Sequence, residues 1–281
     1  MIKITPTEFS NFTKYILDIS GISLDTGKEY LLETRLSPLF SALGCTSFDQ
    51  LYRIAKAEPS KEIEKKIIDA ISTNETYFFR DVTPFELLQH KILPDLIDKR
   101  TRKHTLTSPV NIRFWSAANS TGQELYSIAM VIKELYLDSN KYQVSILGTD
   151  ISDKAIAYAS YGKYNKFEIS RGLPQNRLNK YFNQAENECW RVKDELRAMV
   201  SFKKMNLMKS FAGFGKFDII FCRNVAIYFT QETRKELYKK MASVLEPDGY
   251  LIIGATESLM NDTDLFKPHR YLRSVFYQLN S

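Results

Sequence analysis

The sequence contains few of the residues that form disulfides or hold metal ions. Its 281 residues include 3 Cys and 3 His. Cys45, Cys189 and Cys222 lie far apart, and none of them shows the short Cys or His spacing of a zinc site. We therefore expect three reduced thiols, no disulfide framework and no metal centre.

Long apolar runs are also missing. The longest, such as FDIIFC and YLIIGA, are much shorter than the roughly 20 residues that a membrane-spanning helix requires. The first residues, MIKITPTEFS, contain no apolar signal region. We expect a cytoplasmic protein without membrane insertion.

The positive charge does not indicate a nucleic-acid partner. The formal net charge is +6, yet the first 70 residues carry nearly equal numbers of acidic and basic side chains. The densest basic run, DKRTRKH at residues 98–104, is predicted to end a helix, where the helix dipole favours cations. We expect no nucleic-acid ligand.

Apolar residues in the first 70 positions recur at helical spacing. Four such groups are separated by the turn signals SGISLDTGKE, LGCTSFDQ and AEPSKE. The sequence therefore predicts a small bundle of four helices. Its apolar positions are Phe9, Phe12, Tyr15 and Ile16; Leu31, Leu32, Leu36, Leu39 and Phe40; Leu51, Tyr52 and Ile54; and Ile63, Ile67, Ile68 and Ile71.

From about residue 110 strands and helices alternate, which is typical of a parallel sheet covered on both faces. The segment HRYLRSVFYQL would add a closing antiparallel strand. The pattern predicts a doubly wound α/β domain with a mostly parallel sheet. Its expected strands are NIRFWSA, YQVSILGTD, VSFKKMN, FDIIFCRN and GYLIIGAT, and its expected helices are Glu124–Leu137, Ser152–Ser160 and Gln231–Leu245.

The connection between the helix near Ala155 and the strand at Val200 is too long for an ordinary loop. Its second half, YFNQAENECWRVKDELRAMVSF, alternates apolar and polar residues around polar turns. This predicts a small antiparallel β insert at about residues 181–203. The expected domains are an N-terminal helical domain at 1–72 and an α/β domain at 73–281.

The loop SAANSTGQE follows the first expected strand and contains one glycine, Gly122. Such a strand-to-helix loop presents backbone N–H groups and the helix dipole at the carboxyl edge of the sheet. A dinucleotide fold requires the glycines of G-x-G-x-x-G, so that a pyrophosphate can approach the backbone. Here Ala117, Ala118 and Ser120 favour a ligand without a phosphate, such as S-adenosylmethionine. An ordinary strand-to-helix turn is the alternative.

Polar side chains end the next strands. Asp150 is placed to accept hydrogen bonds from ribose hydroxyls, as in nucleotide-binding folds. Its alternative role is a helix N-cap, for which Ser152 and Asp153 compete. Asn206 and Asn224 end the third and fourth strands, and their amides suit an adenine edge or the methionine end of the ligand. A turn explains either asparagine equally well.

Five segments form a distinctive combination: TNETYFFRD (73–81), RFWSAANSTGQELYSIAM (113–130), GTDIS (148–152), FCRNVAIYF (221–229) and LEPDGYLIIGATESL (245–259). Together they closely resemble the chemotaxis receptor methyltransferases of the CheR family, over nearly the whole chain. The resemblance implies a class I S-adenosylmethionine methyltransferase fold. It also implies methyl transfer to glutamate side chains of the cytoplasmic domain of chemoreceptors, with S-adenosylhomocysteine as the product.

The resemblance also assigns functional positions. In the family an arginine at the place of Arg80 and a tyrosine at the place of Tyr228 are linked to catalysis. We add Ala118, from the loop described above, to the donor-binding positions. Those carried over by motif are Asn74, Thr76, Arg80, Glu124, Asp150, Asn206, Leu207, Asn224 and Val225.

The implied reaction requires few side chains. A glutamate carboxylate has a pKa of about 4.3, so near neutral pH it is already an ionised nucleophile. Because the donor is a cation, catalysis rests on alignment and on removing water from the carboxylate. Arg80 would hold the carboxylate of the substrate or of the donor in a bidentate pair, and Tyr228 would position the methyl group. The alternatives are a surface ion pair for Arg80 and a core aromatic role for Tyr228.

The chain departs from the family pattern in the loop and in the insert. Gln123 and Leu125 stand where most members have Glu and Pro. Because Glu124 is kept, we expect the donor to bind, although with somewhat lower affinity. The connection Asn183–Cys189 has no glycine and is shorter than in members that bind a receptor's C-terminal pentapeptide by strand addition. We therefore expect that this protein does not use the pentapeptide tether.

A further departure lies in the N-terminal helices, which in the family offer a basic helix to an acidic receptor surface. The segment KEYLLETRLSPLFSAL contains only Lys28 and Arg35 as bases. Steering by charge should therefore be weak. Either the receptor surface differs or the substrate is another protein.

Other functions on this fold predict other features. A nucleic-acid base methyltransferase would require a Pro-Pro-aromatic step where the chain has RNVAIYF. The missing glycine fingerprint argues against a dehydrogenase. A small-molecule methyltransferase and a non-catalytic adapter that binds donor or product stay open, and turnover with receptor fragments against free metabolites would separate them.

Overall fold

The structure is a computed structural model that describes residues 2–103, 109–135 and 141–280. It begins with four helices, each with one apolar face. The first starts at a capping box in which Thr5 and Glu8 exchange hydrogen bonds. The apolar faces meet in a core of their own, which also contains Phe48 and Ala55. Of the predicted positions, four are only half-buried: Leu31, Leu39, Tyr52 and Ile54. The predicted bundle is thus confirmed as α1 (Pro6–Ser20), α2 (Glu29–Leu43), α3 (Phe48–Ala57) and α4 (Glu62–Ile71).

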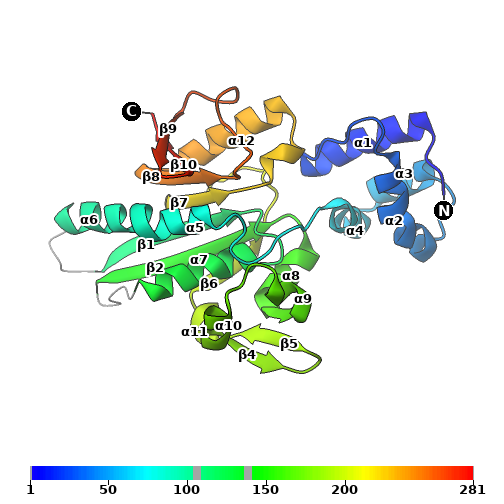
Figure 1. The fold of residues 1–281 in the computed structure, drawn as a ribbon. Coiled ribbons are helices and arrows are strands. Elements are labelled where there is room, and N and C mark those ends of the chain that lie inside the picture. Colours follow the sequence, from blue (N-terminus) through cyan, green and yellow to red (C-terminus); the bar gives the residue numbers. More distant parts are fainter. Residues whose placement is uncertain (1, 104–108, 136–140, 281) are drawn as a thin grey trace.

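The remaining chain is built around a seven-stranded sheet of order β6-β2-β1-β7-β8-β10-β9 (Figure 1). The first five strands are parallel, and the last two form an antiparallel hairpin at the edge. The predicted α/β fold with a mostly parallel sheet is confirmed. The strands are β1 (Val110–Ala117), β2 (Tyr142–Asp150), β6 (Val200–Lys204), β7 (Phe217–Cys222), β8 (Leu245–Ile253), β9 (Phe266–Tyr271) and β10 (Ser274–Leu279).

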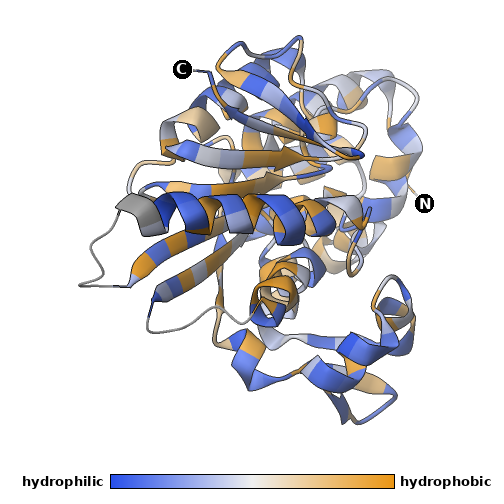
Figure 2. Cartoon of the chain, turned by 60° about the vertical axis from the view of Figure 1, so that its left-hand side comes forward, coloured by the Kyte–Doolittle hydropathy of each residue, from blue (hydrophilic) through white to orange (hydrophobic). Residues whose placement is uncertain are grey.

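Two hydrophobic layers enclose the sheet because neighbouring residues of a strand point to opposite faces. On β1, Phe114 packs with α7 (Gln123–Glu134) and Trp115 packs with α12 (Gln231–Val244). The central strands are accordingly largely hydrophobic (Figure 2). The other covering helices are α5 (Thr83–Leu87), the π-helical η1 (Leu88–Ile92), α6 (Leu93–Lys103) and α8 (Asp153–Tyr161).

Two predicted helix ends reach residues beyond the described ranges. The basic run 98–104 ends α6 at Lys103, while residue 104 lies outside the described residues. The helix expected to end at residue 137 ends at Glu134, and positions 136 and 137 lie outside as well. Within the described ranges, no helix is both long enough and apolar enough to cross a membrane.

The predicted small antiparallel sheet is present, but its bounds differ from the expected 181–203: β4 and β5 lie within that range and β3 lies before it. It has the order β3-β5-β4 and begins with a strand of three residues, whereas 200–204 pairs with β2 in the main sheet. So short a strand shows no alternation, and it reaches its partner only across two intervening helices. The elements of this region are β3 (Lys163–Asn165), α9 (Lys166–Ser170), α10 (Gln175–Tyr181), β4 (Phe182–Ala185), β5 (Cys189–Val192) and α11 (Asp194–Arg197).

Hydrogen bonds join the N-terminal helices to the carboxyl edge of the main sheet. The Asn206 amide donates to the carbonyl of Ile19, at the end of α1, over 2.8 Å. The Ser152 hydroxyl donates to Asp69 of α4 over 2.6 Å. The helical bundle therefore stands beside the strand ends, where open α/β folds bind ligands.

We expect the bundle core to contribute strongly to stability. Ile67 is fully buried, so Ile67→Ala should lower the free energy of unfolding by about 2–5 kcal/mol. Leu272 is 80% exposed and serves as the control, since Leu272→Ala should change that free energy by no more than about 0.5 kcal/mol. Urea denaturation followed by circular dichroism measures both; equal effects would contradict the assigned core.

Candidate active site

A pocket opens at the carboxyl ends of β1, β2, β6 and β7, between the sheet and the N-terminal helices. It holds about 1180 Å³ of empty space, including its open mouth. All eleven residues proposed from the sequence line it, although they come from five separate segments. They are Asn74, Thr76, Arg80, Ala118, Glu124, Asp150, Asn206, Leu207, Asn224, Val225 and Tyr228.

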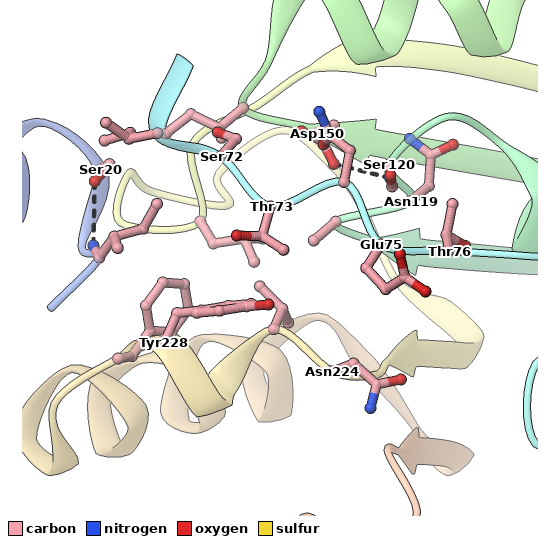
Figure 3. Close-up of a pocket in the computed structure, with 18 of the residues that line it drawn as sticks. Ser20, Ser72, Thr73, Glu75, Thr76, Asn119, Ser120, Asp150, Asn224 and Tyr228 are labelled. Carbon is pink, nitrogen blue, oxygen red and sulfur yellow. Dashed lines mark hydrogen bonds between the residues drawn. The ribbon is translucent and has the colours of Figure 1, made fainter. Parts of the chain in front are cut away.

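The loop after β1 forms one wall with an unusual backbone. Ala118 and Ser120 adopt left-handed φ angles of 60° and 53°, and Gly122 follows at 95°. Non-glycine residues rarely adopt such angles, and those that do concentrate at functional sites. The turn points the amide of Ser120 at the Asp150 carboxylate, over 2.9 Å (Figure 3).

Asp150 is 7% exposed and receives two backbone hydrogen bonds. Ser120 donates to Oδ2, and Ser152 donates to Oδ1 over 3.0 Å. Ser152 itself caps α8, through a hydrogen bond from the amide of Ala155, so Asp150 is not the N-cap. Burial raises the pKa of Asp150, and the backbone donors oppose this shift.

Arg223 connects several charged groups of the site, a role that the sequence did not indicate. Its side chain is 1% exposed. Nη1 donates to Glu124 Oε2 over 2.7 Å, and Nη2 donates to Asp81 Oδ2 over 2.7 Å and to the carbonyl of Arg80 over 2.8 Å. The other Glu124 oxygen accepts from the Ser116 hydroxyl over 2.8 Å. The carboxylate of Glu124 is thus fixed from two sides.

Arg80 is half-buried on the pocket wall. Its Nη1 donates to the carbonyl of Glu75 over 2.6 Å, and the guanidinium lies 5.8 Å from the centre of the Tyr77 ring. The Glu75 carboxylate pairs with Arg171 over 2.5 Å, and this bond lowers the pKa of Glu75. Among the described residues, the Glu75 carboxylate is therefore paired with Arg171 and not with Arg80.

Tyr228 lies on the short helix η2 (Ala226–Tyr228), across the pocket from Asp150 (Figure 3). Its side chain is half-buried and packs against the core on the α12 face of the sheet. Its carbonyl accepts from the amide of Ser23, which follows α1, over 2.8 Å. The bond ties this wall of the pocket to the N-terminal helices.

The two asparagines at the strand ends have structural partners. The Asn206 amide contacts Ile19, as described above, and its Oδ1 accepts from the amide of Met208 over 2.8 Å. Asn224 has a left-handed φ of 56°, and its side-chain amide lies beside Gly254, where a Cβ would come within 2.9 Å of Nδ2. Both side chains shape the pocket through the protein's own contacts.

Glu257 holds two strand ends together and was also missed. Its Oε2 accepts from the amides of Asn224 and Gly254, each over 2.7 Å. Burial raises its pKa, against the effect of these donors. The only signal in the sequence was its place in the segment GATESL, four residues after the strand β8.

Two cations of the N-terminal bundle reach the same pocket. Lys28 and Arg35 were interpreted as bases on a receptor-facing helix, but both line the pocket. Arg35 is anchored by hydrogen bonds to the carbonyl of Ile71 over 2.6 Å and to the hydroxyl of Thr73 over 3.2 Å. No local pattern could have indicated this, because the contact depends on how the bundle sits on the sheet.

The chemistry of the lining residues suits a nucleoside that carries an amino acid. Glu124 and Asp150 offer carboxylates at two places, and Arg80 offers a guanidinium between the bundle and the sheet. Ile151, Met205 and Leu207 supply apolar wall. Across the described ranges, no three His, Cys, Asp or Glu side chains gather as they would around a metal ion.

The chain matches two family models. Residues 7–72 match "CheR methyltransferase, all-alpha domain" and residues 74–274 match "CheR methyltransferase, SAM binding domain". The chain is 39% identical over 280 residues to the chemotaxis protein methyltransferase of Vibrio parahaemolyticus, covering 99% of this chain and 98% of the relative. It is 37% identical over 274 residues to the chemotaxis protein methyltransferase Cher2 of Pseudomonas putida, covering 96% and 97%.

We expect the ionisation of Glu257 to cost stability. Its folded-state pKa lies above the unfolded value of about 4.3, so the folded protein holds the proton more tightly and loses stability as the pH rises between the two values. Glu257→Gln removes this titration. The melting temperature of the wild type should therefore fall relative to that of Glu257→Gln as the pH rises from about 4.3. A difference that is constant, or that changes in the opposite sense, would contradict the assignment.

Proposed function

Because the chain belongs to the CheR methyltransferase family, we propose that it transfers a methyl group from S-adenosylmethionine to glutamate side chains of chemoreceptors. The products are glutamate methyl esters and S-adenosylhomocysteine, and the reaction takes place in the cytoplasm. The observation that carries the proposal is the convergence of eleven proposed positions from five segments on one pocket.

The donor side of the pocket fits S-adenosylmethionine group by group. Glu124 would face the ammonium of the donor, because its carboxylate is fixed by Ser116 and Arg223 at the start of α7. Asp150 would accept from the ribose hydroxyls, with its orientation fixed by two backbone amides. Leu207 and its apolar neighbours would cover the adenine. When bound, S-adenosylmethionine supplies an electrophilic methyl group on a sulfonium.

On the acceptor side we place Lys28, Arg35 and Arg80, which all line the pocket, and Arg80 also belongs to the donor-binding positions. These cations would attract an acidic segment of a partner protein and hold its carboxylate. An acceptor glutamate has a pKa of about 4.3, so no side chain needs to remove a proton. Arg80 and Tyr228 would orient the carboxylate and exclude water from it, which is the main task of the protein in this reaction.

We also propose that the protein works without a pentapeptide tether. The connection between β4 and β5 consists of residues 186–188, and Asn187 and Glu188 adopt left-handed φ angles of 60° and 50° without any glycine. So tight a turn leaves few backbone groups beyond the two strands to which a pentapeptide could bind. The edge of β4 stays available to extended peptides in general.

The decisive test is transfer of labelled methyl groups into cytoplasmic fragments of chemoreceptors. We expect base-labile label, as for a methyl ester. Arg80→Ala should lower kcat about 100-fold or more, as for other lost charge-stabilising groups, and Tyr228→Phe about tenfold. Base-stable label, or rates independent of both side chains, would contradict the proposal. Transfer only to free metabolites would indicate a small-molecule enzyme, and binding without transfer an adapter.

The absence of a tether has its own test. A receptor that ends in such a pentapeptide should be methylated at the same kcat/KM, within about twofold, with and without its last five residues. Wild-type protein and receptors of both lengths suffice. A fall of tenfold or more on truncation, about 1.4 kcal/mol of binding, would show that the tether is used.

A further inference from the structure

The Arg223 side chain contacts both halves of the proposed site. Through Nη1 it holds Glu124 on the donor side, and through Nη2 it holds the Arg80 carbonyl and the Asp81 carboxylate in the segment that carries Arg80. The two carboxylates come from different parts of the chain: Glu124 lies in the first turn of α7, and Asp81 belongs to the segment before α5. The guanidinium also lies 5.7 Å from the centre of the Phe85 ring, a cation–π contact.

Because Arg223 is buried, its contacts to acidic and carbonyl oxygens cannot be lost without a large cost in free energy. A cation that is 1% exposed must be compensated by its partners, because removing one of them leaves an unbalanced buried charge. A lysine would keep the charge, but a single ammonium cannot reproduce the planar fork that reaches three acceptors. The position of Glu124 and the path of the chain at Arg80 are therefore linked through one rigid group.

The segment that carries Arg80 needs such support. Phe79, Asp81 and Val82 adopt left-handed φ angles of 52°, 66° and 42°, which are unfavourable for these residues. The amide of Phe79 is held by the Ser127 hydroxyl over 3.0 Å, and the amide of Val82 by the carbonyl of Phe79 over 2.9 Å. Arg223 supplies the contacts to the two residues between them, Arg80 and Asp81.

We propose that Arg223 is a positioning residue that couples the two halves of the site, fixing the Glu124 carboxylate and the Arg80 segment at the same time. The inference rests on the proposed function. It implies that a change at Arg223 affects donor binding and methyl transfer together. A change at Asp81 breaks only the contact to the Arg80 segment and keeps the contact to Glu124, so it lowers donor affinity less than a change at Arg223 does.

The test compares Arg223→Lys and Asp81→Ala with a matched control, Arg100→Lys. Arg100 likewise pairs with two acids, Asp218 over 2.5 Å and Asp248 over 2.8 Å, but does not line the pocket. Calorimetry measures the affinity for S-adenosylhomocysteine, and methyl transfer to receptor fragments gives kcat. Amide hydrogen exchange at Phe79 and Val82, in protein without ligand, reports the Arg80 segment independently of turnover.

We expect Arg223→Lys to lower both the affinity and kcat about tenfold or more, the change that one lost charge-assisted hydrogen bond produces. Asp81→Ala should lower kcat to a similar extent and lower the affinity less than Arg223→Lys does. Both variants should speed exchange at Phe79 and Val82. Arg100→Lys should change none of these quantities, whatever it does to the melting temperature.

The coupling is overturned if Arg223→Lys lowers only one of the two quantities, or if it behaves like Arg100→Lys. If Arg223→Lys does not fold, Asp81→Ala decides, because Asp81 is 30% exposed and tolerates replacement. An unchanged kcat and unchanged exchange in that variant then overturn the inference. If the wild type binds neither S-adenosylmethionine nor its product, it is the proposed function that fails.

Discussion

The parallel pairing of β2, β1 and β7 brings three strand ends to the same edge of the sheet, and each of them is followed by a turn that contributes to the pocket. Parallel strands run in the same direction, so the residues that follow each strand all lie at the carboxyl edge of the sheet. Asp150, the loop after Ala117 and the segment after Cys222 therefore meet, although they are far apart in the chain.

Strain and burial accompany this arrangement. Left-handed residues other than glycine lie in all three walls: Asp81 before α5, Ser120 after β1 and Asn224 after β7. Such conformations cost free energy, and here they are held by hydrogen bonds to buried acids and to Arg223. The ionised forms of Asp150 and Glu257 are also disfavoured, since burial raises the pKa of each carboxyl group. The rigidity of the site thus rests on charged groups rather than on apolar packing alone.

The N-terminal bundle completes the site rather than standing apart from it. Its own core is separate from the two cores of the sheet, yet Ser23, Ile19 and Asp69 form hydrogen bonds across the junction. Lys28 and Arg35 thereby reach the pocket from α2 and its start. A protein substrate at the pocket would contact cations from the bundle and from the sheet domain. The position of Lys28 and Arg35 in the pocket therefore matters more than the small number of bases on α2.

The four helices of the bundle and the order of the parallel strands followed from the sequence alone, because the spacing of apolar residues depends only on neighbours along the chain. The segments NETYFFR and FCRNVAIYF likewise indicated the family and six of the eleven pocket positions, since a motif carries its residues together. Only the tertiary structure decided how those side chains are held. Arg223 lies 99 residues from Glu124 and 142 from Asp81, the three-residue strand β3 finds β5 across two helices, and the amide of Asn206 is directed to Ile19. None of these contacts leaves a local pattern, because each exists only once the chain has folded distant segments against one another.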